Sequence, residues 1–174
     1  MMDNNLKTEL ELKMKKGRIL LFDHESDLLI PLQLKLSSLS HRALICYIHD
    51  IIKSMLTQYD LSSYHETIID ATNKNWLWAT GKIKMDAAKK TILNLHLQAK
   101  TASKQHAYLL HAIAQGLSVT HTKRHAMGLA FYELSGLYEK YRNTDIIQSR
   151  ITWYLSRSNN IEIPDTPWAN FIKG

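Results

Sequence analysis

Nine histidines stand out in this chain of 174 residues, and two of them have a spacing that could support chemistry. His121 and His125 lie four positions apart, so a continuous helix would place both imidazoles on one face, as in zinc-binding pairs. Lys123 and Arg124 lie between them, however, and the glutamate of an HExxH zinc motif is absent. The pair therefore allows two interpretations. It is either a metal site completed by a distant carboxylate or histidine, or a pair of polar histidines at a helix junction, bonded to the backbone or to a carboxylate such as Glu133.

A second group of chemically active residues falls on a predicted helix that begins near His41. His41 is at its start, while His49 and Asp50 lie more than two turns later, so His41 and Asp50 do not share a local site. We expect Asp50 to form a structural ion pair with a histidine or arginine of another helix rather than an acid/base pair. Cys46 is the single cysteine, and on an apolar helix we expect it to pack in the core rather than act as a nucleophile.

Two tryptophans separated by one residue, Trp76 and Trp78, would point in different directions on a helix. We expect one of them in the core and the other at the surface, as an anchor for a partner protein. The sequence contains no glycine-rich phosphate loop, no GxSxG nucleophile elbow and no cysteine pair for zinc, so no cofactor is expected. These residue types give no motif for catalysis.

Hydrophobic spacing predicts that most of the chain is α-helical. The strongest pattern covers residues 41–58, after serines that can cap a first turn. A second helix is predicted to start at a capping box of Ser63 and Glu66 and to stop at Gly81. A third helix is predicted over residues 84–101.

The stretch from Lys104 to Tyr141 is the apolar centre of the sequence. Its first half is apolar almost all the way round, which is typical of a helix surrounded by other helices. Its glycines would let neighbouring backbones approach closely. We predict two helices here, with a break near residues 120–124, followed by a sixth helix capped at Asn143.

Residues 1–40 are predicted to form an N-terminal arm or a short hairpin, in which residues 1–16, before Gly17, are a frayed or short amphipathic helix. Pro31 lies inside a short apolar run and argues against a central strand but allows an edge strand or extended segment. Residues 158–174 are predicted to be an irregular tail. We therefore predict a single all-α domain over residues 1–174, with about five to six helices bundled over residues 41–157.

The composition is that of a folded protein, with 45% apolar and 22% charged residues. No stretch reaches the roughly 18 consecutive apolar residues of a membrane span, and no signal peptide is evident. A single cysteine gives no disulfide framework, so we expect a reducing cytoplasm.

The net charge of +6 suits an acidic protein surface or nucleic acid. Because the lysines are spread along the chain without interleaved aromatics, we expect no nucleic-acid partner.

Three motifs follow one another in order between His41 and Tyr132. They read His41-Arg42-x-Leu44, Trp78-Ala-Thr-Gly81-Lys-Ile83 and Thr120-His121-x-x-x-His125-Ala126-x-Gly128-x-Ala130-x-Tyr132. In their order and separation they resemble a family of small helical immunity proteins of bacterial polymorphic toxin systems. The resemblance covers about half of the chain. It implies a cytoplasmic, all-α protein without catalysis that binds and neutralises a cognate toxin made by its own cell.

A protein of this kind works through a rigid scaffold and one complementary surface. The candidate contact residues are His121, His125, His41, Arg42, Asp50, Trp76 and Trp78. Because the chain is basic, we expect its toxin either to carry an acidic patch or to be inhibited away from any nucleic-acid groove. Metal binding through His121 and His125 is the first alternative and nucleic-acid association the second. The sequence leaves open whether the chain forms a homodimer.

Overall fold

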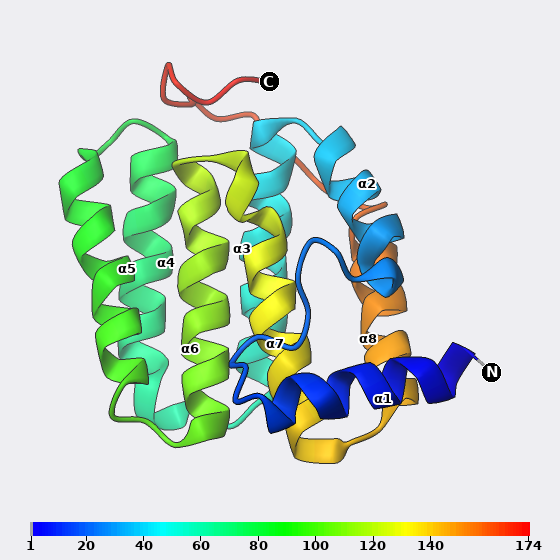
Figure 1. Ribbon diagram of the computed structural model, residues 1–174. Helices are drawn as coiled ribbons and strands as arrows, with labels where there is room; N and C mark the ends of the chain where they lie inside the picture. The colour runs from blue at the N-terminus through cyan, green and yellow to red at the C-terminus, as the bar shows by residue number, and fades with distance from the viewer. Residues whose placement is uncertain (1) are drawn as a thin grey trace.

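The computed structural model describes residues 2–174, with side chains from residue 6 onward, and within them all regular secondary structure is helical. Eight α-helices in these residues pack around one contiguous core (Figure 1). They are α1 (Met2–Lys15), α2 (Ile30–Ser38), α3 (His41–Gln58), α4 (His65–Ala79), α5 (Met85–Ala99), α6 (Lys104–Leu117), α7 (Ala126–Tyr141) and α8 (Thr144–Arg157). The prediction of an all-α protein is therefore confirmed.

The prediction of about five to six helices with an N-terminal arm or hairpin is wrong, because the region before His41 contributes α1 and α2. Pro31 lies in the first turn of α2. A proline there removes no helical hydrogen bond, since the first N–H groups have no partner within the helix, and its fixed φ suits the helix. Pro31 thus marks a helix start rather than an extended segment. Met1, which the predicted domain includes, lies outside the described residues.

The helices predicted from His41 onward are confirmed to within a few residues. Two of their caps also form as expected. The Ser40 hydroxyl accepts a hydrogen bond from the N–H of Ala43 at 3.2 Å, and the Asn143 side chain accepts one from the N–H of Asp145 at 2.8 Å. Such a cap stabilises a helix by about 1 kcal/mol because it satisfies an otherwise unpaired donor.

The start of α4 differs from its prediction. Ser62–Tyr64 form a 3₁₀ turn, and α4 begins at His65 without a side-chain cap, so the predicted capping box at Ser63 is wrong. The end of α4 is as expected. Gly81 follows it with a φ of +75°, a conformation that glycine adopts without strain.

α6 is the central helix of the bundle, with α5 on one side and α7 on the other (Figure 1). The backbones of α6 and α7 approach closely where Gly136 meets Tyr108. A Cβ atom at Gly136 would lie 2.8 Å from the Cβ of Tyr108, which is too short for any real contact. The predicted break in this stretch is confirmed as two 3₁₀ turns, η3 (Ser118–Thr120) and η4 (Lys123–His125).

A buried carboxylate joins α7 to α3 and α8. Glu133 is 1% exposed, and Tyr59 donates to its Oε1 from 2.6 Å. Arg150 of α8 donates to both carboxylate oxygens, at 2.7 and 3.1 Å, and the Tyr154 hydroxyl is bonded to Oε2. A buried charge is stable only when it is paired and hydrogen-bonded in this way.

The two edges of the bundle differ in how they are covered. α5 is the outermost helix on one side and packs against α4 and α6, while α2 and α8 lie at the opposite side and α1 crosses one end (Figure 1). Among the helices of residues 2–174, none has both the length and the apolar character that a membrane crossing requires.

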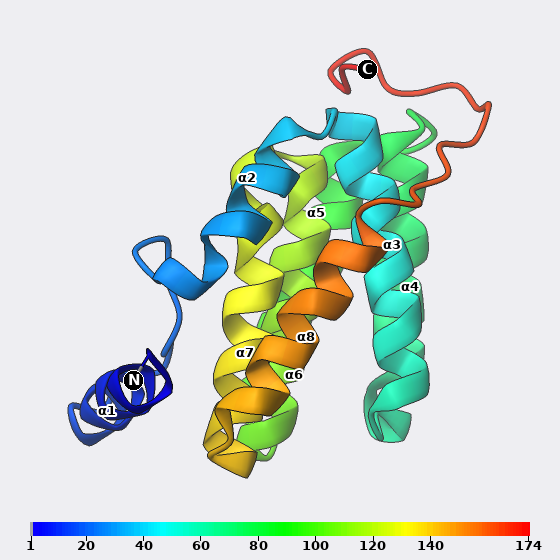
Figure 2. The same ribbon diagram turned by 90° about the vertical axis from the view of Figure 1, so that its right-hand side faces the viewer.

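The tail after α8 continues past α3 and crosses the end of the bundle at which α4 ends (Figure 2). The N–H of Ala169 donates to the carbonyl of Ala79 at 2.9 Å. Trp168 packs edge-on against Trp76, with ring centroids 5.4 Å apart, and Phe171 packs on Trp78 at 5.5 Å. The irregular tail predicted from the sequence is thus held on the bundle by aromatic contacts.

Candidate functional site

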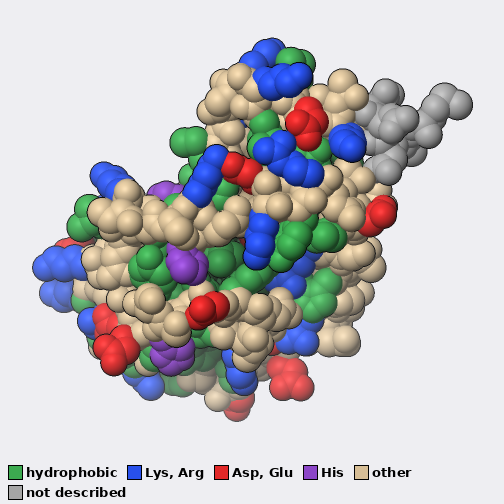
Figure 3. All heavy atoms as spheres, turned by 90° about the horizontal axis from the view of Figure 1, so that it is seen from below, with side chains coloured by type: hydrophobic (Ala, Val, Ile, Leu, Met, Phe, Trp, Pro, Cys, Tyr) green, Lys and Arg blue, Asp and Glu red, His purple; other side chains and the backbone are tan. Residues whose placement is uncertain are grey.

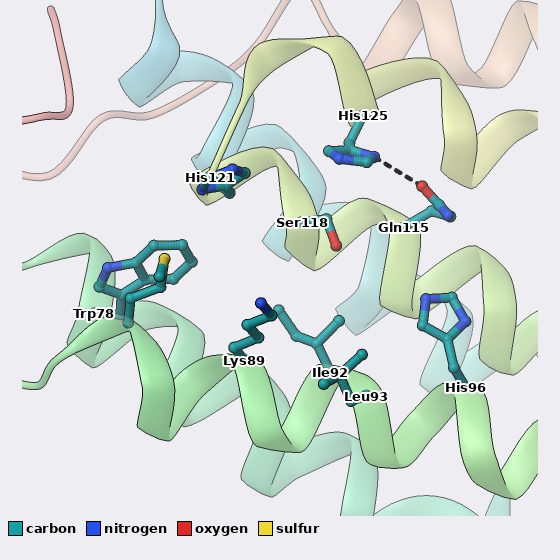
Figure 4. A pocket seen from close by; sticks show the side chains of 10 residues that line it. Trp78, Lys89, Ile92, Leu93, His96, Gln115, Ser118, His121 and His125 are labelled. Atoms are coloured by element: carbon teal, nitrogen blue, oxygen red, sulfur yellow. Dashed lines mark hydrogen bonds between the residues drawn. The ribbon is translucent and has the colours of Figure 1, made fainter.

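A pocket of about 280 Å³ opens between α5, α6 and the connection from α6 to α7. Across it, Lys89, Leu93 and His96 of α5 face Gln115, His121 and His125 (Figure 4). Trp78 closes one end. Among the described residues, those that line the pocket include three histidines and one lysine but no aspartate or glutamate. The pocket is therefore apolar with cationic or neutral polar groups, a chemistry that suits an acidic or apolar ligand group.

His121 and His125 meet at this pocket, although they do not share a helix. The extended backbone of Thr122, with φ −154° and ψ 135°, separates η3 from η4 between them. His125 donates from Nδ1 to the Oε1 of Gln115 at 2.9 Å. The ring of His121 stacks on Trp78, with centroids 6.5 Å apart and an interplanar angle of 24°. The pair thus lies at a helix junction, as the polar-histidine interpretation expects, but His125 bonds a side-chain amide rather than the backbone or a carboxylate.

The alternative of a metal site needs at least a third ligand beside the pair. Among the side chains that the structure describes, from residue 6 to residue 174, no group of three or more histidine, cysteine, aspartate or glutamate residues lies close enough together to hold a metal ion. Glu133, which the sequence offered as a partner for the pair, instead binds Arg150. The structure therefore gives the metal hypothesis no further support.

A second pair of histidines lies next to the pocket. His96 of α5 and His111 of α6 share a hydrogen bond between their Nδ1 atoms at 2.7 Å, so one imidazole donates and the other accepts. The ring of Tyr132 lies 5.1 Å from that of His111. Burial lowers the pKa of His96, and the neighbouring His111 and His125 lower it further. Burial also lowers the pKa of His111 and of His125, so these rings are mainly neutral at pH 7.

The two tryptophans predicted to divide between core and surface are both covered. Trp78 is 6% exposed and Trp76 is half-buried, because the tail residues Phe171 and Trp168 lie against them. Trp76 also packs against His49 at 5.4 Å. Trp78 contributes to the wall of the histidine pocket, whereas Trp76 does not line it.

His41 and Arg42 lie outside the pocket, and Arg42 packs against the same tail. The Nε2 of His41 donates to the carbonyl of Val119 at 2.7 Å and so ties the start of α3 to η3. The Arg42 guanidinium lies 5.7 Å from the ring centre of Trp168. Its Nε is buried and has no hydrogen-bond partner among the described residues. Both residues therefore support the end of the bundle rather than the pocket.

Asp50 and Cys46 lie on the side of α3 that faces α8 and the tail, away from the histidines. Asp50 pairs with Arg157 of α8, whose Nε donates to Oδ2 at 2.8 Å, so its partner is an arginine of another helix as expected. The pair is partly exposed to solvent, not buried. Burial raises the pKa of the Cys46 thiol to about 11, which leaves it protonated and weakly nucleophilic at neutral pH.

Of the candidate residues, the structure brings His121, His125 and Trp78 together and leaves His41, Arg42, Trp76 and Asp50 elsewhere. It adds Lys89, His96 and Gln115, for which the sequence gives no motif. Helical spacing places Lys89 and His96 on one side of α5. No local signal shows that this side of α5 faces the connection after α6, because that depends on how the helices pack.

Comparison with known proteins supports the resemblance seen in the motifs. No curated protein and no solved structure gives a significant match to the chain. A family model, in contrast, matches residues 34–160, which include α3 to α8 and every residue of the histidine pocket. Since that match spans well over half of the sequence, the chain belongs to the family described as "Imm-5 like putative immunity protein".

Proposed function

We propose that this chain is an immunity protein that binds a cognate bacterial toxin and neutralises it without catalysis. The observation that carries the proposal is the family match over residues 34–160. An inhibitor of this kind needs a rigid scaffold with one complementary surface. A bundle whose helices share one core, with the connection between α6 and α7 held by hydrogen bonds, is a scaffold suited to that task.

The charge of the chain bears on the toxin it would bind. With a net charge of +6, the protein would be attracted to an acidic surface and repelled by a strongly basic one. On the face drawn in Figure 3, lysine and arginine side chains are interspersed with acidic and apolar ones. We therefore propose a toxin with an acidic patch, and place the encounter in the cytoplasm of the cell that makes both proteins.

The proposal is tested by expressing the product of the adjacent gene in a bacterial host, with and without this chain. We expect the adjacent product alone to stop growth, and co-expression to restore it. The two proteins should then co-purify as a stoichiometric complex. An unrelated helical protein expressed at the same level is the control for nonspecific protection. If this chain protects no better than the control and does not co-purify, the proposal is wrong.

A further inference from the structure

The outer side of α5 carries a row of exposed apolar side chains. Met85, Leu93 and Leu97 are 40%, 54% and 60% exposed, and Leu93 and Leu97 are neighbours one helical turn apart. α5 lies at the edge of the bundle, where α4 and α6 cover only its inner side (Figure 1). Single exposed leucines are ordinary, but a row of them beside an open apolar pocket marks an interaction surface.

The charges around this row have mainly one sign. Lys89, Lys90 and Lys100 are exposed on or just after α5, and Asp86 is the single acidic residue of that helix. The adjoining pocket adds the imidazoles of His96, His121 and His125 and, among the described residues, no carboxylate. A partner that covers this area would thus place apolar groups on the leucines and acidic groups near the lysines.

We propose that the outer side of α5 and the adjoining histidine pocket, together called the α5 surface, form the site at which the chain binds its toxin. The matching patch on the toxin has an apolar side chain at its centre and aspartate or glutamate at its rim. The apolar side chain enters the pocket next to Trp78 and Leu93, and the carboxylates meet Lys89 and the pocket histidines. This inference rests on the proposed function.

A rival surface lies on α2, where Ile30 and Leu34 are also exposed, next to a second pocket that includes Lys123 and Arg124. It has a shorter apolar row, and of its two exposed residues Ile30 lies before the matched residues 34–160 and Leu34 is the first of them. α5 lies wholly within the matched residues. These differences favour the α5 surface and make α2 a suitable comparison in the experiment.

The experiment measures the affinity of the purified full chain for the product of the adjacent gene by calorimetry. Leu93→Glu places a charge in the centre of the α5 surface and is expected to weaken binding at least about 30-fold. The matched control is Leu12→Glu on α1, since Leu12 is 52% exposed and the substitution is the same. Lys89→Glu should weaken binding by a smaller factor, mainly through slower association at low salt, whereas Lys53→Glu on α3 should not.

The outcomes separate this inference from the proposed function. If the wild-type chain neither protects cells nor binds, the proposed function fails and this inference fails with it. If the wild-type chain protects and Leu93→Glu binds as tightly as Leu12→Glu, the α5 surface alone is overturned. If Leu34→Glu abolishes binding and Leu93→Glu does not, the toxin binds at α2 and the proposal of the α5 surface is wrong. Since Leu93 and Leu12 are both exposed, circular dichroism should show that each variant folds as the wild type does.

Discussion

Glu133 shows how a single residue is fixed by partners that come from distant parts of the chain. Its carboxylate is surrounded by Tyr59, Tyr154 and Arg150, and the Arg150 guanidinium in turn lies 3.7 Å from the ring centre of Trp153. Arg150 is itself largely shielded from water. In a buried environment an ion pair adds little net stability compared with apolar residues of similar size. Removing one partner, however, leaves an unpaired buried charge, which lowers the free energy of unfolding strongly.

We predict that Glu133→Gln lowers the free energy of unfolding by about 3–5 kcal/mol, because it leaves the Arg150 charge buried without its counterion. Urea unfolding followed by circular dichroism measures the change. The control is Asp70→Asn, which breaks a solvent-exposed pair with Lys74 one turn away on α4. That pair should contribute less than about 1 kcal/mol. Equal losses in the two variants would show that burial does not govern the cost.

For single residues, the sequence points to two of the pocket histidines but does not show which side chains lie next to them. His121 and His125 were selected because a helix would align them, yet they reach one pocket across two 3₁₀ turns. His96 was not selected, because its closeness to His111 depends on the contact between α5 and α6. Spacing along one element is readable from a sequence, whereas the pairing of elements is decided by packing.

Among the elements, the helices after His41 were predictable because each has an apolar stripe, although the start of α4 is not the capping box that the sequence predicts. α2 was missed because Pro31 and a short apolar run are equally typical of an extended segment, and only position in the first turn makes proline compatible with a helix. α1 has few apolar residues, and its place is set by the burial of Leu10 against the body. Whether α1 and α2 form, and where they lie, therefore depends on their contacts with the rest of the chain.

The contact between α6 and α7 can be tested at Gly136. Alanine is a better helix former than glycine by about 1 kcal/mol, so propensity alone predicts that Gly136→Ala is stabilising. The added Cβ would lie 2.8 Å from the Cβ of Tyr108, an atom close to the backbone that cannot move aside on its own. Overpacking of this kind costs about 1–3 kcal/mol, and we therefore expect a net loss of about 1 kcal/mol. A rise in the unfolding midpoint would show that α6 and α7 can separate without cost.

For the whole molecule, the sequence predicted the helical class and the family, while the exposed edge at α5 had to come from the structure. The apolar stripe of α5 reads in the sequence as Met85, Ala88, Ile92, Leu95 and Ala99. The last four are buried, whereas Met85 is 40% exposed. Leu93 and Leu97 give no sign in the sequence of facing solvent, because they fit an apolar helix equally well inside a bundle. Their exposure follows from α5 having neighbours on its inner side alone.

Four partly buried histidines give the whole molecule a pH dependence of stability. Burial lowers the pKa of His49, which donates to Asn75 at 3.0 Å and packs on Trp76, and burial likewise lowers the pKa of His96, His111 and His125. As the pH falls below about 6.5, the unfolded chain takes up protons on these imidazoles before the folded chain does. The free energy of unfolding should therefore be constant above about pH 7.5 and decrease from about pH 6.5 downward.

Urea unfolding at a series of pH values from 8 to 5 measures this decrease. We expect His49→Gln to reduce its slope, because the variant removes one group that binds a proton more weakly in the folded state. His65→Gln is the matched control, since His65 is exposed at the start of α4 and its replacement should leave the slope unchanged. Stability that stays constant down to pH 5 would mean that the folded protein accepts these protons as readily as the unfolded chain. The pocket histidines would then gain their charge as the pH falls through about 6.5, and an acidic toxin patch would meet a more positive α5 surface at about pH 6 than at about pH 7.5.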